Sequence, residues 1–173
     1  MRTTHRRLVP TVPSVALALW AALAGPASAQ SQASSKGEDP LFGTWVLDVS
    51  KSRYSPGPPP KSQSRSYEKH RLGIRATVKT VQSDGRSTTV QTVYDFDNME
   101  HPVTGSEDVD SIVMKRIDAY TAEGTLSHAG RETGTLRRVI SKDGKSMTVT
   151  LQRTTPPANN MEVYEKVSDD VVR

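Results

Sequence analysis

The sequence has no cysteine among its 173 residues. This absence excludes a disulfide scaffold, thiolate-bound zinc or iron–sulfur sites, a cysteine nucleophile and a lipidated N-terminal cysteine. The chain also lacks an apolar run of the roughly 20 residues that a membrane-spanning helix needs. Its longest apolar stretch runs only from Val12 through Leu23 and contains Pro13. We therefore expect no integral membrane anchor.

The first 29 residues predict a cleaved secretory signal peptide. The start carries three arginines, the apolar run follows, and Gly25-Pro26 breaks it. Ala27-Ser28-Ala29 then presents small residues at the positions that a signal peptidase inspects. We expect cleavage after Ala29, a mature chain that begins at Gln30, and export to the periplasm or the extracellular space.

Little net charge remains once this segment is set aside. The whole chain has 23 Lys plus Arg against 19 Asp plus Glu. Three of the basic residues lie in the predicted signal peptide, so the mature chain has 20 basic and 19 acidic groups. No basic patch is visible, and we expect no nucleic-acid partner.

Sustained helical periodicity is absent from residue 30 onward. Residues 30–40 are mostly Ser, Gln, Gly and charged residues, and they predict a flexible lead-in. From residue 41 the chain alternates short extended segments, rich in Val, Thr and Tyr, with turn residues. We predict one folded domain over 41–168 and a C-terminal tail at 169–173. The predicted strands are 41–48, 64–71, 74–82, 87–96, 111–118, 119–127, 133–140, 146–153 and 161–167.

The side chains of these segments alternate with a period of two. Met147, Val149 and Leu151 fall on one face of their segment, as do the residues at 90, 92, 94 and 96 of another. Asp84-Gly85 and Asp143-Gly144 each stand between two extended runs, where glycine tolerates the positive φ of a tight hairpin. The pattern predicts an antiparallel sandwich or a closed barrel.

Two polar interruptions stand out. Residues 55–60, Ser-Pro-Gly-Pro-Pro-Pro, predict an exposed, polyproline-like crossover between the first two strands, and a ligand for a proline-binding partner is the alternative. Residues 105–110 concentrate three carboxylates. We interpret them as a solvated loop, because a calcium site needs more oxygen ligands and the EF-hand pattern is absent.

The two ends of the predicted domain resemble known barrel families. Its first strand reads Phe-Gly-Thr-Trp-Val-Leu at 42–47, which resembles the G-x-W signature of lipocalins and the start of fatty-acid-binding proteins. Its last strand, Val-Tyr-Glu-Lys-Val at 163–167, is similar to the closing strand of the latter. The order of F-G-T-W, Y-S-P-G-P-P-P-K, H-P-V-T-G, K-R-I-D and S-K-D-G-K-S-M-T-V-T resembles exported bacterial proteins described as lipocalin-like, over residues 41–167.

This resemblance implies an all-β, antiparallel up-and-down calycin-type barrel of about 8 to 10 strands. The proline run excludes a helical lid of the kind found in fatty-acid-binding proteins. Trp45 would close one end of the barrel, and Gly43 would permit close backbone approach on the same face. Fatty-acid-binding proteins hold a carboxylate with an arginine two positions before the closing tyrosine. Here that position is Glu162, which would repel a fatty-acid head group.

The histidines and serines give no catalytic or metal-binding signature. His70, His101 and His128 lie on separate segments without metal-ligand spacing, and the G-x-S-x-G motif is absent. Asp97, Glu100 and His101 are close in sequence, and we interpret them as part of a turn at a barrel rim. We expect no catalytic residue, no metal and no cofactor.

Arginines inside predicted strands are the best candidates for a binding site. Because Arg137 and Arg138 are consecutive in a strand, one of them must face inward. The inward arginine would pair with a carboxylate such as Glu162, with Arg138 the first choice, or would hold an anionic ligand. The predicted ligand-binding residues are Arg138, Glu162, Tyr164, Arg116 and Tyr94.

These observations predict a monomeric, exported, lipocalin-like protein that holds a small hydrophobic or amphipathic molecule in its interior. Two alternatives stay open. The barrel mouth could carry an isomerase or hydrolase site, for which the sequence displays no convergent acid–base set. The rim loops could instead recognise another envelope protein, although they are too polar to predict a large apolar patch.

Overall fold

A computed structural model describes residues 39–167, and within them ten antiparallel strands form a closed barrel. Each strand pairs with its neighbours in sequence, and β1 pairs with β10, so the barrel has no free edge. The predicted all-β, up-and-down barrel is confirmed. The strands are β1 Gly43–Leu47, β2 Ser62–His70, β3 Gly73–Val81, β4 Ser87–Tyr94, β5 Glu100–Thr104, β6 Ser111–Arg116, β7 Thr121–His128, β8 Arg131–Ile140, β9 Ser146–Thr154 and β10 Pro157–Lys166.

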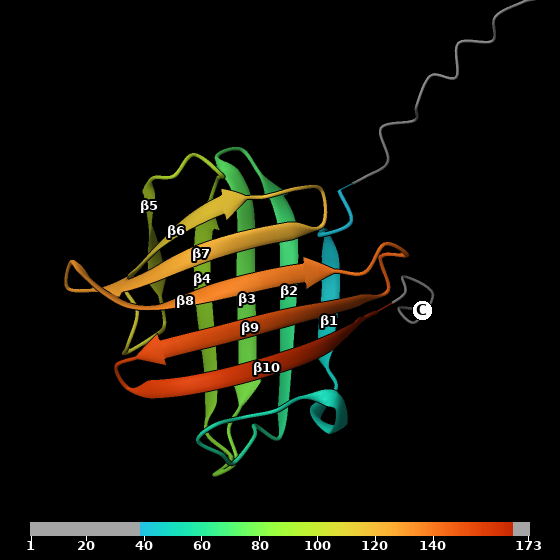
Figure 1. Ribbon diagram of the computed structural model, residues 1–173, viewed down its shortest axis with the longest axis vertical. Helices are drawn as coiled ribbons and strands as arrows, with labels where there is room; N and C mark the ends of the chain where they lie inside the picture. Colours follow the sequence, from blue (N-terminus) through green and yellow to red (C-terminus); the bar gives the residue numbers. More distant parts are fainter. Residues whose placement is uncertain (1–38, 168–173) are drawn as a thin grey trace, which may run out of the picture. The chain divides into compact units, whose positions relative to one another are not determined.

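The barrel is flattened into two layers. Figure 1 shows β1 to β5 in one layer, while β6 to β10 run across them in the other. Side chains that alternate along each strand point into the space between the layers, as the period of two predicts. The predicted signal peptide, most of the lead-in and the tail at 169–173 lie outside the described residues. No helix within residues 39–167 is long and apolar enough to cross a membrane.

The two predicted hairpins are confirmed. Gly85 has φ 93° and Gly144 has φ 69°, and both backbones are in the left-handed region that glycine favours. In each turn the glycine N–H donates to a carbonyl three residues earlier, over 2.9 Å to Gln82 O and 2.9 Å to Ser141 O. These turns fix the registers of β3 with β4 and of β8 with β9.

Strand β5 was not predicted from the sequence. Its segment contains Pro102, and the sequence predicts a rim turn at Asp97, Glu100 and His101, but Glu100 and His101 pair with β6. The strand is short, and its register with β4 joins only Gln91 with Thr104 and Thr92 with Val103. Proline lacks the N–H of a full ladder, so a short, weakly paired strand is the environment in which it is tolerated.

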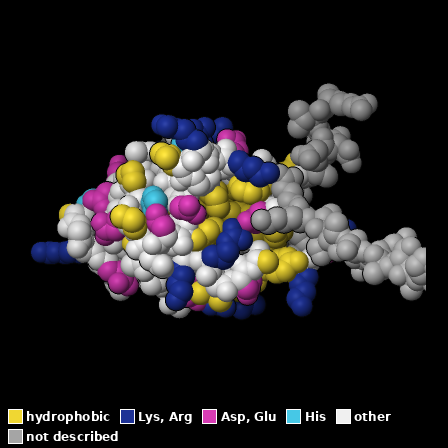
Figure 2. All heavy atoms as spheres, turned by 90° about the horizontal axis from the view of Figure 1, so that it is seen from above, with side chains coloured by type: hydrophobic (Ala, Val, Ile, Leu, Met, Phe, Trp, Pro, Cys, Tyr) yellow, Lys and Arg dark blue, Asp and Glu magenta, His cyan; other side chains and the backbone are white. Residues whose placement is uncertain are grey.

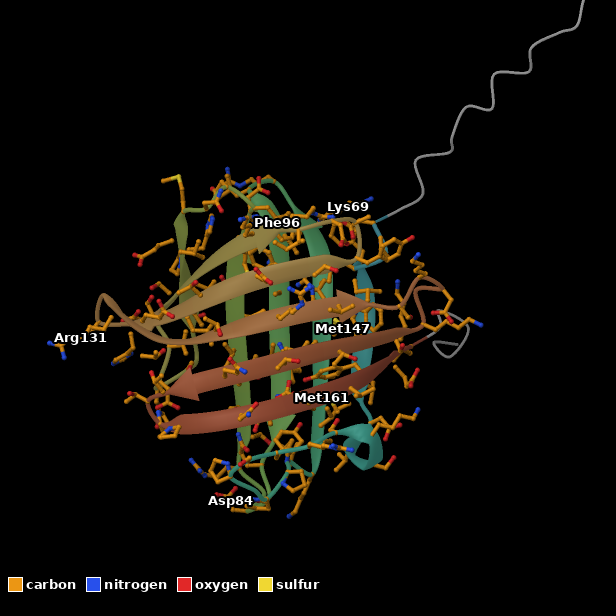
Figure 3. All side chains as sticks on the ribbon, in the orientation of Figure 1. Lys69, Asp84, Phe96, Arg131, Met147 and Met161 are labelled. Carbon is orange, nitrogen blue, oxygen red and sulfur yellow. The ribbon has the colours of Figure 1, made fainter. Side chains whose placement is uncertain are left out.

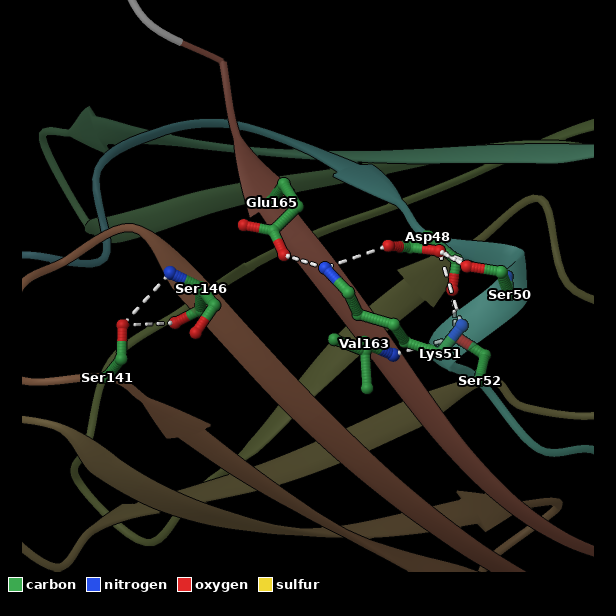
Figure 4. A network of polar contacts seen from close by, with 8 residues as sticks. All are labelled: Asp48, Ser50, Lys51, Ser52, Ser141, Ser146, Val163 and Glu165. Atoms are coloured by element: carbon green, nitrogen blue, oxygen red, sulfur yellow. Dashed lines mark hydrogen bonds and ion pairs between the residues drawn. The ribbon is translucent and has the colours of Figure 1, made fainter.

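The connection between β1 and β2 begins with a one-turn 3-10 helix, Val49–Lys51, and forms no helical lid. Asp48 caps this turn, accepting from Ser50 N at 3.0 Å and Lys51 N at 3.2 Å. Hydrogen bonds from Ser50 and Lys51 lower the pKa of Asp48 to about 2. Lys51 Nζ also lies 2.9 Å from Glu165 Oε1 (Figure 4), so the turn is tied to β10 beside the seam that closes the barrel.

The remainder of this connection, residues 52–61, differs in part from the expected exposed crossover. Pro56 through Pro59 are exposed, but Pro60 is buried. The segment is held to β10 by Arg53, which forms a bridge with Met161, and by Asn159 N, which donates to Ser55 O at 2.6 Å. The proline run therefore lies along the end of the barrel that it crosses.

Trp45 lies at the centre of the apolar core. Its side chain is 0% exposed, and its Nε1 donates to Leu41 O at 2.9 Å. Lys166 Nζ lies 5.2 Å from the centre of the indole ring. Gly43 has φ 123°, and a Cβ built there would come within 2.9 Å of Lys166 Cε, so a side chain at this position would displace Lys166. The indole is therefore fully enclosed, and its ring nitrogen has a hydrogen-bond acceptor.

Candidate functional site

A cavity of about 570 Å³ lies between the two layers. Its volume is within the range of roughly 300 to 1,000 Å³ that small-molecule sites occupy. Its rim includes prolines of the β1–β2 connection, Arg86 beside the β3–β4 turn and the β5–β6 loop at 105–108; we call this the open end. Apolar side chains form much of its wall: Ala76, Val78, Val90, Val103, Val109, Ile112, Met114, Leu126, Leu136, Val149 and Leu151.

The opposite end is filled by side chains, and we call it the closed end. Figure 3 places Phe96 there and Asp84, in the β3–β4 turn, at the open end. Leu41, Phe96 and Tyr120 line a space of only about 10 Å³, which has room for at most one water molecule. Figure 2 looks onto this end and shows hydrophobic side chains gathered among charged ones.

Arg138 lies at the deep end of the cavity, where it lines both the cavity and the small space beyond it. It is 5% exposed, and its Nη1 donates to Tyr94 Oη at 2.9 Å. Its guanidinium carbon lies 5.0 Å from the centre of the Tyr67 ring. Burial opposes the charged form, but the two phenols outweigh it and hold the pKa of Arg138 above its ordinary value.

The alternation of β8 decides which of the two consecutive arginines faces inward. Leu136, Arg138 and Ile140 point toward the interior, whereas Arg137 is exposed and pairs with Glu123 on the outer surface. Opposite Arg138 on β7 is Ala122, whose small side chain leaves room for the guanidinium. The sequence alone left this choice open.

The two phenols beside Arg138 differ in their titration. Burial raises the pKa of Tyr94. Burial also opposes ionisation of Tyr67, but the guanidiniums of Arg138 and Arg65 together outweigh it and lower the pKa of Tyr67. Tyr67 is thus placed between the guanidinium groups of Arg65 and Arg138.

A second cluster of buried polar side chains consists of Glu162, Arg65 and Tyr164. Glu162 is 4% exposed, and its Oε2 accepts from Arg65 Nη2 at 2.8 Å and from Tyr164 Oη at 2.5 Å. Arg65 Nε donates to the same tyrosine oxygen at 2.8 Å. Burial raises the pKa of Tyr164, so its hydroxyl stays protonated as a donor. The three side chains satisfy one another.

The expected pairing of Glu162 with Arg138 is wrong. Register places Arg138 opposite Val149, and Val149 opposite Glu162, so the two charges lie two strands apart with Val149 between them. Arg65 approaches Glu162 from the side of β10 opposite to β9. It lies on β2, one strand beyond β1, whose Leu47 pairs with Tyr164.

These pairings leave the cavity with an unbalanced positive charge at its deep end. Glu162 neutralises Arg65, while within residues 39–167 Arg138 takes part in no ion pair. Phenol oxygens accept hydrogen bonds from Arg138 but bring no full negative charge. A buried cation is costly unless an anion accompanies it, and an anionic ligand group would fill this role.

The other predicted site residues are not all brought together. Tyr94 and Glu162 line the cavity with Arg138, whereas Tyr164 lies behind Glu162 and does not line it. Arg116 lies at the closed end, where its Nη2 is 2.6 Å from Asp39 Oδ2 and its guanidinium covers the Phe96 ring at 4.3 Å. It is separate from the cavity.

Sequence reasoning missed Arg65 and Tyr67. Both lie in a segment predicted as a strand, and their alternation with Gln63 places all three on the inner face. The signal was therefore present, since an inward arginine follows from the period of two once Tyr67 is assigned to the core. The strand is almost entirely polar, so its sequence does not show which face points into the barrel.

The comparisons with known proteins add no family. No protein-family model matches the sequence, and no curated protein matches it. Within residues 39–167, no group of three or more His, Asp or Glu side chains could hold a metal ion. The candidate site is therefore defined by the geometry of the barrel interior.

Proposed function

We propose that the protein binds a small amphipathic anion inside the barrel, with the acidic group at Arg138 and the apolar part along the cavity wall. The observation that carries this proposal is a buried arginine without a carboxylate partner at the deep end of a largely apolar cavity. Tyr94 supports it, because a hydroxyl that accepts from Arg138 keeps its own proton to donate to an anion.

Glu162 does not argue against an anionic ligand in this arrangement. The sequence predicted that an inward carboxylate would repel an acidic head group, but Arg65 neutralises it at 2.8 Å. In this proposal the protein is a monomeric, lipocalin-like carrier, and its signal peptide directs its export to the periplasm or the extracellular space. Native mass spectrometry of protein purified from the envelope of the cells that naturally produce it would identify a retained ligand.

The direct test uses a matched pair of arginine variants on one strand. Binding of the fluorescent anion anilinonaphthalene sulfonate is titrated in wild type, Arg138→Gln and Arg137→Gln. A hydrogen bond to a charged group contributes about 1.5 to 3 kcal/mol, so Arg138→Gln is expected to weaken binding roughly tenfold or more. Arg137→Gln, on the outer face of β8, is expected to bind as wild type does.

Arg138→Lys distinguishes a loss of affinity caused by the missing charge from one caused by misfolding. It retains a cation in the cavity and is expected to recover part of the affinity, while thermal denaturation confirms that each variant is folded. Equal affinities for Arg138→Gln and Arg137→Gln would contradict the proposal.

A further inference from the structure

Strand β7 carries small side chains at the level of the proposed anion site. Its inner face presents Ala122, Gly124 and Leu126, and all three residues are buried. In register, Ala122 lies opposite Arg138 on β8. Gly124 lies opposite Leu136, two residues earlier on that strand. Gly124 is therefore one inward position away from the level of the arginine that we assign to the anion.

The backbone does not require a glycine at position 124. Gly85 and Gly144 have the positive φ that their hairpin turns need, whereas Gly124 is not among the residues with a positive φ. A glycine inside a strand has no side chain to pack and weakens the strand, so it often marks a place where another group approaches closely. The reason for Gly124 therefore lies in its surroundings.

Side chains from both neighbouring strands occupy the space that a side chain at position 124 would take. A Cβ built on Gly124 would come within 2.7 Å of Met114 Sδ and 3.1 Å of Leu136 Cγ. Met114 pairs with Gly124 from β6, and Leu136 pairs with it from β8. Both side chains also line the cavity. They are thus recessed into the wall over Gly124, and a side chain there would push them toward the cavity.

The recess widens the cavity beside the proposed anion site. Leu136 is the inward neighbour of Arg138 on β8, so the widening lies directly next to the guanidinium. In the other layer Ala76, another small residue, lines the cavity and pairs with Tyr67. The centre of the Tyr67 ring lies 5.0 Å from the guanidinium carbon of Arg138. A straight hydrocarbon chain does not need this width next to its acidic group, whereas a ring system does.

We infer that the ligand is an acid whose ring system lies directly beside its acidic group, and that Gly124 is the positioning residue that makes room for the ring. This inference rests on the proposed function and names its ligand class. Gly124 acts through Met114 and Leu136, which form the wall against which the ring packs. A methionine side chain is flexible, so Met114 can move when the space over Gly124 is filled.

The first test compares two carboxylates by titration calorimetry: adamantane-1-carboxylate, and undecanoate, which has the same number of carbon atoms in a straight chain. The ring acid is expected to bind severalfold more tightly, because a rigid ring loses less conformational freedom on binding than a chain does. If undecanoate binds as tightly or more tightly, the ring assignment is wrong and the proposed function stands. If neither acid binds, the proposed function itself fails.

Gly124→Ala tests the positioning role. The added methyl group should displace Met114 toward the cavity, and a change of one methylene group in an apolar pocket alters affinity roughly tenfold or more. Binding of adamantane-1-carboxylate should weaken by about this factor. Undecanoate can bend away from the displaced side chain and should lose much less. Thr125→Ala, on the outer face of the same strand, is the control and should leave both affinities unchanged. An equal loss for both acids would contradict the positioning role.

A second substitution distinguishes positioning from damage to the fold. In the double variant Gly124→Ala, Met114→Val, the sulfur atom that the new methyl group would displace is absent. This variant should recover most of the affinity for the ring acid, and thermal denaturation checks that it is folded. A folded double variant that binds adamantane-1-carboxylate as weakly as Gly124→Ala does would overturn the role assigned to Gly124.

Discussion

The closed end and the open end of the barrel are built by the same strands with different kinds of side chain. On β8, Ile140 packs in the apolar core, while Arg138, two residues earlier, lines the cavity. On β10, Tyr164 lies behind the cavity, and Glu162, the previous inward residue, lines it. Along one strand, two successive inward residues can thus differ in role: one packs in the core and the next lines the cavity.

The two ends also differ in how their polar atoms are satisfied. At the closed end Trp45 Nε1 has its acceptor in Leu41 O, and apolar burial supplies the stabilisation. Toward the open end the cavity holds the Arg65–Glu162 pair, and such pairs are weak evidence for stability because desolvation offsets their attraction. The closed end is therefore expected to stabilise the fold, while the cavity holds the candidate site.

Trp45→Ala gives the largest expected loss of stability. Removing a fully buried indole from the closed end should lower the free energy of unfolding by about 3 to 5 kcal/mol. Pro59→Ala, in the exposed part of the open-end connection, should change it by no more than about 0.5 kcal/mol. Urea denaturation measures both. Similar denaturation midpoints for the two variants would show that the closed end does not contribute more to stability than the open end.

Glu162→Gln is expected to separate stability from binding. The change leaves the buried guanidinium of Arg65 without its carboxylate, at a cost of about 3 kcal/mol. It also adds a second unbalanced cation to the cavity, so an anionic probe should bind more tightly than to wild type. Denaturation and titration of a fluorescent fatty acid measure the two effects. Equal affinity for both proteins would show that Glu162 does not influence the ligand.

Arg138→Met tests whether the deep cation serves binding alone. Replacing a buried charge that has no carboxylate partner by an apolar side chain should change the free energy of unfolding by less than about 1 kcal/mol. Binding of the anionic probe should weaken roughly tenfold or more, as in Arg138→Gln. A loss of stability as large as that of Trp45→Ala would make Arg138 part of the structural core.

The architecture could be predicted from the sequence because its signals are local. A period of two, two Asp-Gly turns and the motif around Trp45 each involve neighbours in the chain, and together they indicated an antiparallel barrel. Strand β5 was missed because Pro102 removes the local signal, although pairing with β4 and β6 still makes it a strand.

The site was only partly predictable because its contacts join distant strands. Alternation was enough to turn Glu162 inward, but its partner depends on the registers that align β10, β1 and β2. Those registers bring Arg65 to Glu162 and interpose Val149 before Arg138. A one-residue slip in any of them would reverse which side chains meet, and no short segment of sequence encodes that choice.

The smallest expected effect concerns the exposed charges at the open end, in contrast to the buried pair inside. The pKa of Asp48 is lowered to about 2 by hydrogen bonds from Ser50 and Lys51, compared with an ordinary value of 3.8. A carboxylate whose pKa is lower in the folded state stabilises the fold above its unfolded pKa, and this contribution is lost as the pH falls toward 2. Asp48→Asn should therefore unfold at a slightly lower temperature than wild type at pH 6. The difference should shrink between pH 4 and pH 2, as wild-type Asp48 becomes protonated. Thermal denaturation across this range measures it, and a difference independent of pH would show that the cap acts through its geometry alone.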